Sequence, residues 1–423
     1  MDIGASVRFD HQLLAVESEH QVHCMLELAP PAAASAASRT PLHLAVVLDR
    51  SGSMAGPKLD TARECAAYLS RRLSPTDELA IVTYDDEVRL DLALSAVEGH
   101  GALLERALRH ITPGGATNLS GGWLKGLEQL RAVPGGRGPK QIVLLSDGLA
   151  NHGITDAATL IGMTRTAADD GVTTTTIGFG DGFDEELMTG MADSGAGHSY
   201  FAATPEEAPG IFGQEFEGLA SIVAQNVSVE LRPTSDVKVL GVLNDHPQVP
   251  VAGGVQLQLG DAYAQERRRI VFELSVPRLA ELGVAVVAEI VVRYVSVAAE
   301  VASHELRVPV SVNMVSAAEA AASGPDHEVT EEVVVLKAAR AQDEARNRAR
   351  AGDIDGAQRL LRETAVDLRR AAPSSARSAE LEDQASEMEQ HAQILDDDGH
   401  MSSLQSKRMH YESYERKRRR NKE

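Results

Sequence analysis

Hydrophobic residues follow two different repeats along the chain, and the first covers about residues 42 to 219. There, short uninterrupted apolar runs alternate with helix-like segments. The runs expected to form strands are Leu42–Leu48, Leu79–Tyr84, Ile142–Leu145 and Thr173–Phe179. The helices expected between or after them are Lys58–Leu73, Ala102–His110, Gly121–Ala132, Thr159–Asp170 and Asp184–Ala192. This order predicts an α/β domain over residues 40–220, with a doubly wound, mostly parallel sheet covered on both faces.

The second repeat is strict alternation of apolar and other residues, and it dominates residues 222–316. Val227, Val229 and Leu231 show it, and similar segments follow up to Val312. Alternating segments separated by turn residues predict an antiparallel β-sandwich. Residues 1–30 hold two further strand-like segments, which cannot form a stable domain alone. We expect them to join the sandwich, so that the α/β domain is an insertion within it.

Residues 328–396 are rich in Ala, Arg, Glu and Leu, which favours helices. The expected helices lie near 331–350, 356–371 and 378–394, and Gly352 is a natural stop between the first two. Residues 399–423 are different, because six of the seven residues from Arg416 to Lys422 are basic. We expect a flexible tail there, either solvated or bound to an acidic partner, a membrane surface or nucleic acid.

Overall charge limits the classes of partner. The chain has 62 acidic residues against 41 Lys and Arg, a formal net charge of −21. This sign disfavours nucleic-acid binding by the body of the chain. Two cysteines, Cys24 and Cys65, cannot make a disulfide framework, and neither a secretory signal nor a membrane span is recognisable. A cytoplasmic protein is therefore expected.

The candidate chemistry begins where the first parallel strand ends. Asp49, Ser51 and Ser53 form a D-x-S-x-S sequence directly after Leu42–Leu48. Alternate residues of an extended loop can point the same way, so one carboxylate and two hydroxyls can converge. Carboxylate and hydroxyl oxygens are hard ligands, suited to Mg²⁺, Mn²⁺ or Ca²⁺ rather than to zinc.

Two more oxygen donors are expected at the same edge of the sheet. Thr117 lies in a glycine-rich loop between two predicted helices, and Asp147 follows the apolar strand Ile142–Leu145. Ligands of parallel sheets bind at the carboxyl ends of the strands. Each residue taken alone could instead cap a loop or a helix. All of them together predict a site for a divalent metal ion.

These residues closely resemble the metal-ion-dependent adhesion site (MIDAS) of the von Willebrand factor type A family, over about residues 42 to 219. The family has D-x-S-x-S, then a Thr in a glycine-rich loop, then an Asp after a later strand. The matching positions are Asp49, Ser51, Ser53, Thr117 and Asp147. The flanking sandwich more loosely resembles bacterial cytoplasmic members and inter-alpha-trypsin-inhibitor heavy-chain-like proteins. The resemblance implies a doubly wound fold, a bound Mg²⁺ or similar ion, and capture of an Asp or Glu of a protein partner.

Three functions remain open at this point. The first is a metal-dependent protein-binding module, which is not an enzyme. The second is a metal-dependent hydrolase or phosphatase of the haloacid-dehalogenase type, but such enzymes need D-x-D, and Ser51 stands at the second position. The third is an adaptor for a separate AAA-type ATPase, since the chain has no phosphate-binding loop of its own. The composition of the site favours binding over catalysis.

Overall fold

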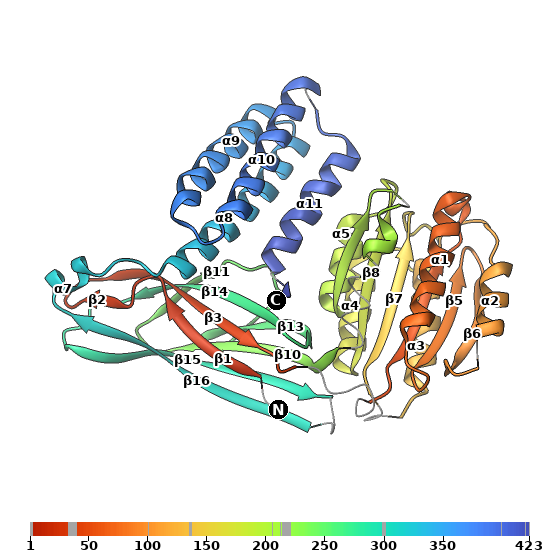
Figure 1. Cartoon of the computed structure of the whole chain (residues 1–423), viewed down its shortest axis with the longest axis horizontal. Helices are drawn as coiled ribbons and strands as arrows, with labels where there is room; N and C mark the ends of the chain where they lie inside the picture. The colour runs from red at the N-terminus through yellow and green to blue at the C-terminus, as the bar shows by residue number, and fades with distance from the viewer. Residues whose placement is uncertain are drawn as a thin grey trace.

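The computed structural model of the chain describes residues 3–32, 40–99, 101–134, 138–204, 206–211, 213, 221–297, 302–398, 400–418 and 420–422. Figure 1 shows an α/β domain at one end, a long β-sandwich at the other, and a group of C-terminal helices above the sandwich. A long helix near the C-terminus lies between that group and the α/β domain (Figure 1).

The α/β domain is built on one mixed sheet. Its strands, in spatial order, are β6 (Val88–Ala96), β5 (Glu78–Tyr84), β4 (His43–Asp49), β7 (Lys140–Ser146), β8 (Val172–Phe179) and β9 (Ala196–Ala202). All neighbouring strands are parallel except β5 and β6. The four predicted strands are β4, β5, β7 and β8. The sequence analysis missed β6 and β9, which lie at the two edges of the sheet and lack a continuous apolar run.

Helices cover both faces of this sheet. Their bounds are α1 (Pro57–Arg72), α2 (Gly101–His110), α3 (Leu119–Arg131), α4 (Ala157–Asp169) and α5 (Glu185–Ser194). The central strand β4 explains the arrangement, because each of its residues is buried. Val46 packs in the same cluster as apolar residues of α1 and α2, and Val47 packs with α3, α4 and α5 on the opposite face. The prediction of a doubly wound α/β fold is confirmed.

The sandwich has two sheets. One orders β1 (Gly4–Phe9), β3 (His20–Ala29), β14 (Glu266–Val276) and β11 (Lys238–Val242). The other orders β12 (Gln248–Val251), β13 (Gly254–Tyr263), β10 (Ile222–Pro233), β15 (Gly283–Ser296), β16 (Ala302–Val315) and β2 (Leu13–Ala15). Strand β3 pairs with β14 from His20–Val276 through Leu28–Arg268. The N-terminal strands therefore share a core with strands that follow the α/β domain.

The C-terminal region is helical. Its elements are α7 (Ala317–Ala322), α8 (His327–Arg350), α9 (Ile354–Ala371), the 3₁₀ turn η2 (Ala372–Ser374), α10 (Ser378–Asp398), α11 (Ser403–Arg418) and the short strand β17 (Arg420–Lys422). Three of the helices, α8, α9 and α10, correspond to those expected from the sequence. None of the helices in the described ranges has the length and hydropathy needed to cross a lipid bilayer.

The prediction of a flexible basic tail over residues 399–423 is wrong for its described part. Residues 403–418 form α11, and β17 pairs with β14. Tyr411 and Tyr414 are buried against the α/β domain, where the Tyr414 hydroxyl donates to Asp193 Oδ1 at 2.7 Å. Lys417 bonds to Asp245 at 2.7 Å and also pairs with Asp343. Acidic groups of distant elements therefore replace the solvent that was expected to surround these charges.

Candidate metal centre

Asp49 ends β4 and is completely buried. Its Oδ1 accepts the backbone N–H of Ser51 at 2.8 Å, and its Oδ2 accepts the hydroxyl of Ser146 at 2.7 Å. Burial raises the pKa of Asp49 to about 6, and the nearby charge of Asp147 acts in the same direction, while the hydrogen bonds oppose the rise. The carboxylate is thus fixed in one orientation at the carboxyl end of the sheet.

Ser53 connects Asp147 to the first loop. It lies in the short 3₁₀ turn η1 (Gly52–Met54), and its hydroxyl donates to Asp147 Oδ1 at 2.7 Å. The Oγ atoms of Ser51 and Ser53 are 3.2 Å apart. Asp147 follows β7, and its other oxygen, Oδ2, accepts a hydrogen bond from the ammonium group of Lys58. The two carboxylates and two serine hydroxyls predicted for the site therefore form one connected group.

Thr117 completes the set from a third loop. Its backbone N–H donates to Asn151 Oδ1 at 2.8 Å, and its carbonyl accepts the backbone N–H groups of Asn151 and His152 at 3.1 and 3.2 Å. Gly148 shows where its hydroxyl lies. A Cβ atom at that glycine would be 3.3 Å from Thr117 Oγ1 and 3.5 Å from Ser53 Oγ. Both hydroxyls thus lie beside the same point. Glycine leaves this point empty, whereas a side chain at position 148 would fill it.

The donor set suits a hard divalent cation. All five residues predicted from the sequence meet at one edge of the sheet. They offer two carboxylates and three hydroxyls, all oxygen donors. Within the described ranges, no three His, Cys, Asp or Glu side chains gather as a metal site would need. A metal centre at this place would draw on hydroxyl as well as carboxylate oxygens.

The sequence analysis missed an ion pair that holds the loops of the site together. Arg50 Nη2 and Asp85 Oδ1 are 2.6 Å apart, and the two side chains are only 4% and 5% exposed. Asp85 Oδ2 also accepts the backbone N–H of Gly115 at 3.2 Å. A Cβ at Gly114 would lie 1.6 Å from Asp85 Oδ2, so this position requires glycine. The available signal was the place of Asp85 directly after β5, next to Arg50 directly after the neighbouring strand β4.

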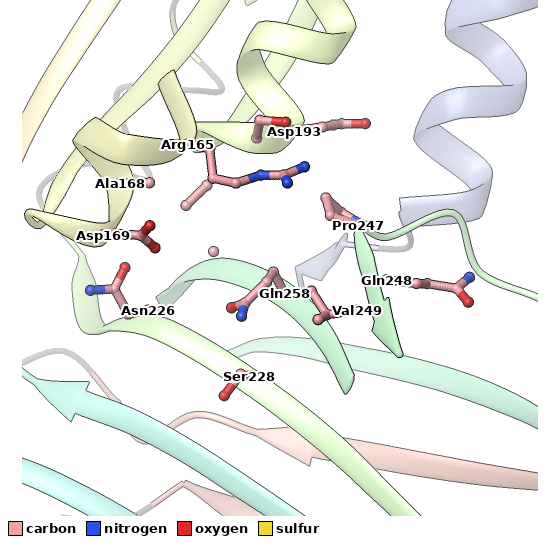
Figure 2. A pocket seen from close by; sticks show the side chains of 13 residues that line it. Arg165, Ala168, Asp169, Asp193, Asn226, Ser228, Pro247, Gln248, Val249 and Gln258 are labelled. Carbon is pink, nitrogen blue, oxygen red and sulfur yellow. The ribbon is translucent and has the colours of Figure 1, made fainter. Parts of the chain in front are cut away.

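A pocket lies at the end of the sheet opposite the candidate metal centre, between the α/β domain and the sandwich (Figure 2). Its volume is about 510 Å³. Arg165 and Asp169 of α4 line it from one side, and Asn226 and Gln258 of the sandwich from the other. Because α4 ends where β8 begins, the pocket lies near the amino ends of the parallel strands. It is therefore separate from the residues around Asp49.

The similarity to known proteins follows the same division of the chain. Residues 43–214 match the family model of the von Willebrand factor type A domain. The chain contains a von Willebrand factor type A (VWA) domain. The match spans the sheet, its helices and all five candidate metal-binding residues. The predicted family is confirmed, and VWA domains commonly mediate protein–protein interactions.

Relatives resemble more of the chain than its VWA domain. An uncharacterised protein of Synechocystis, sll0103, is 27% identical over 336 residues, covering 77% of this chain and 78% of that protein. Human inter-alpha-trypsin inhibitor heavy chain H1 is 27% identical over 212 residues, covering 48% of this chain and 23% of that protein. A solved structure, a von Willebrand factor type A protein from Catenulispora acidiphila, has a TM-score of 0.69 at 15% identity, covering 92% of this chain and 88% of that one. The last similarity shows that the combination of a VWA domain with the flanking elements is a shared fold.

Proposed function

We propose that this chain is a metal-ion-dependent protein-binding module. In this proposal the VWA domain captures an acidic residue of a protein partner through a divalent cation. The residues that hold the cation are Asp49, Ser51, Ser53, Thr117 and Asp147. Mg²⁺ is the proposed ion, with Mn²⁺ or Ca²⁺ as substitutes, because the donors are hard oxygen atoms.

The observation that supports this proposal most directly is the arrangement around Gly148. The Thr117 and Ser53 hydroxyls lie 3.3 and 3.5 Å from the point where a Cβ would stand. Hydroxyl ligands carry no charge, so they neutralise a cation less than carboxylates do. A bound divalent cation would supply an electrophilic position for a carboxylate oxygen from outside. Ser51 and Ser146 fix Asp49, and Ser53 fixes Asp147, so that the donors are already oriented.

We favour binding over catalysis because of what surrounds Asp49. Both of its oxygens already accept hydrogen bonds, from Ser51 and Ser146. These hydrogen bonds fix the carboxylate in place, and catalysis would additionally need an acid–base partner beside it. A D-x-D phosphatase would provide that partner two residues later, where this chain has Ser51. An adaptor role for a separate AAA-type ATPase is compatible with the same binding chemistry and concerns only the identity of the partner.

The proposal is tested first with the metal alone. Metal-stripped full-length chain is titrated calorimetrically with Mg²⁺, beside the double variant Asp49→Ala, Asp147→Ala. We expect one ion per wild-type chain and no measurable binding to the variant. Equal affinity in both proteins would refute the site.

Carboxylate capture is tested with a small probe. With Mn²⁺ in the site, N-acetylglutamate α-amide should displace a metal-bound water and lower the water-proton relaxation enhancement. The neutral glutamine analogue should have no effect. If the two probes behave alike, the site does not recognise carboxylates.

We also propose a cytoplasmic location. Cys24 and Cys65 are free, buried thiols. Cys24 lies in the sandwich core, and Cys65 lies on the buried face of α1 in the VWA domain. Free thiols in two separate cores suit a reducing compartment. Fractionation of cells that produce the native chain would test this, and recovery outside the cytoplasm would contradict it.

A further inference from the structure

Lys58 reaches from the surface to a buried carboxylate of the candidate metal centre. It is the second residue of α1, and its ammonium donates to Asp147 Oδ2. The Asp147 side chain has no exposed area, whereas that of Lys58 is 32% exposed. The lysine side chain therefore extends from the solvent to a buried carboxylate of the site.

Helix formation does not explain a lysine at this place. The N-terminus of a helix carries partial positive charge, which favours acidic residues in the first turn and disfavours basic ones. The β8–α5 loop, in contrast, lies directly beside both Lys58 and Asp147. A Cβ at Gly180 would be 3.6 Å from both Cε and Nζ of Lys58, and one at Gly182 would be 2.7 Å from the Asp147 carbonyl oxygen. The contacts of the Lys58 side chain are thus with residues of the site, and helix formation does not account for them.

The charges within the site also indicate a role for Lys58. Asp49 and Asp147 contribute two negative charges when ionised, and Lys58 contributes one positive charge. Arg50 and Asp85 form their own buried pair and cancel each other. A divalent cation at the two carboxylates would give a neutral site without the lysine, and a net charge of +1 with it. A net charge of +1 matches one incoming carboxylate.

We infer that Lys58 is a specificity-determining residue, a second cationic group that receives the partner's carboxylate beside the metal ion. The inference rests on the proposed function, and it also predicts that Lys58 lowers the affinity of the site for the metal ion. The ammonium competes with the ion for Asp147 and repels it, so Lys58 weakens metal binding while it strengthens carboxylate binding. Removing its charge should therefore shift the two affinities in opposite directions, which a merely structural residue would not do.

The experiment uses four full-length proteins: wild type, Lys58→Met, Lys58→Arg and the control Lys125→Met. Lys125 has the same side-chain exposure, 32%, but pairs with Glu128 on α3. Mg²⁺ affinity is measured by calorimetry. Affinity for N-acetylglutamate α-amide is measured by Mn²⁺ relaxation. Circular dichroism melts check that each variant is folded.

For Lys58→Met we expect Mg²⁺ to bind roughly three- to tenfold more tightly and the carboxylate probe to bind about tenfold more weakly, as expected for one charge at short range near a protein surface. Lys58→Arg should retain most of the probe affinity, and Lys125→Met should match the wild type. Unchanged affinities in Lys58→Met, or shifts of both in the same direction, would overturn the inference. Failure of the wild type to bind Mg²⁺ would instead overturn the proposed function itself.

Discussion

Arg50 and Asp85 form a buried ion pair, with 2.6 Å between Nη2 and Oδ1, although 35 residues separate them in sequence. Arg50 lies inside the D-x-S-x-S loop, and Asp85 accepts a hydrogen bond from the loop that leads to Thr117. The pair therefore holds two of the three loops of the candidate metal centre in register. Because it is buried, breaking one side leaves an uncompensated charge.

Replacing Asp85 with Asn should destabilise the protein by about 3 kcal/mol, because it leaves the Arg50 guanidinium buried without its counter-charge. Mg²⁺ affinity should fall as well, since the change weakens the side-chain contact of residue 85 with Gly115 in the Thr117 loop. Urea denaturation and calorimetry measure the two effects. The matched control is Asp170→Asn, which breaks the exposed pair with Arg131, whose side chains are 50% and 55% exposed. That change should stay within about 0.5 kcal/mol, and an equal loss in both variants would contradict the role of burial.

Gly148→Ala should leave the fold intact and weaken Mg²⁺ binding by about tenfold or more, because the new methyl group stands between the hydroxyls of Thr117 and Ser53. Calorimetric titration of the metal-stripped variant provides the measurement. Gly162→Ala is the control, since nothing lies within 4 Å of a Cβ at that helical position. It should stabilise the protein by about 0.5–1 kcal/mol and leave Mg²⁺ affinity unchanged. Normal Mg²⁺ binding by Gly148→Ala would mean that the ion lies elsewhere.

Thr117→Ala should weaken binding of the carboxylate probe more than binding of Mg²⁺. The change removes one hydroxyl but retains both carboxylates, and the hydrogen bonds of Thr117 to Asn151 and His152 through its backbone are unaffected. Thr117→Ser keeps the hydroxyl and should behave much like the wild type. Both affinities are measured on the same samples. Unchanged probe binding in the alanine variant would argue against an open position beside Thr117.

His410 should make the stability of the chain depend on pH. Burial in α11, followed by the nearby charge of Arg346, lowers its pKa to about 4. Between about pH 4 and 6.5 the unfolded chain therefore binds a proton that the native chain does not, so this group lowers stability as pH falls through that range. The loss should be on the order of 2 kcal/mol between pH 7 and 5. Urea denaturation of wild type and His410→Asn at pH 7, 6 and 5 should give a smaller decrease for the variant, and parallel curves would contradict the prediction.

The sandwich should not fold without the N-terminal strands. Strand β3 lies between β1 and β14, so a fragment of residues 222–316 exposes the edge of β14. We expect that fragment to be insoluble or to melt without cooperativity, and a peptide of residues 1–30 to restore a cooperative transition. Calorimetric or circular dichroism melts of the fragment, with and without the peptide, provide the test. A cooperative melt that the peptide does not change would show that residues 222–316 form a complete domain.

Features that depend on short stretches of chain could be predicted from the amino-acid sequence. The continuous apolar run at Leu42–Leu48 predicts a strand buried on both faces, and β4 is one. That run is followed directly by Asp49, Ser51 and Ser53, and another such run is followed by Asp147. Because the carboxyl ends of parallel strands share one edge of the sheet, this rule was sufficient to predict that these residues lie close together. The strand and the closeness of these side chains could be predicted because they depend on local periodicity and on one general property of parallel sheets.

Features that depend on partners far away in sequence became visible only in the folded chain. A run of basic residues near Arg416 is typical of a solvated tail. In the folded chain, however, these charges pair with Asp343, Asp245 and Glu387 on other elements. Helix α11 itself packs between the other C-terminal helices and the VWA domain (Figure 1). The Arg50–Asp85 and Lys58–Asp147 pairs were equally hidden. Whether a charged side chain meets solvent or a buried counter-charge is set by the packing of distant segments, which local pattern does not encode.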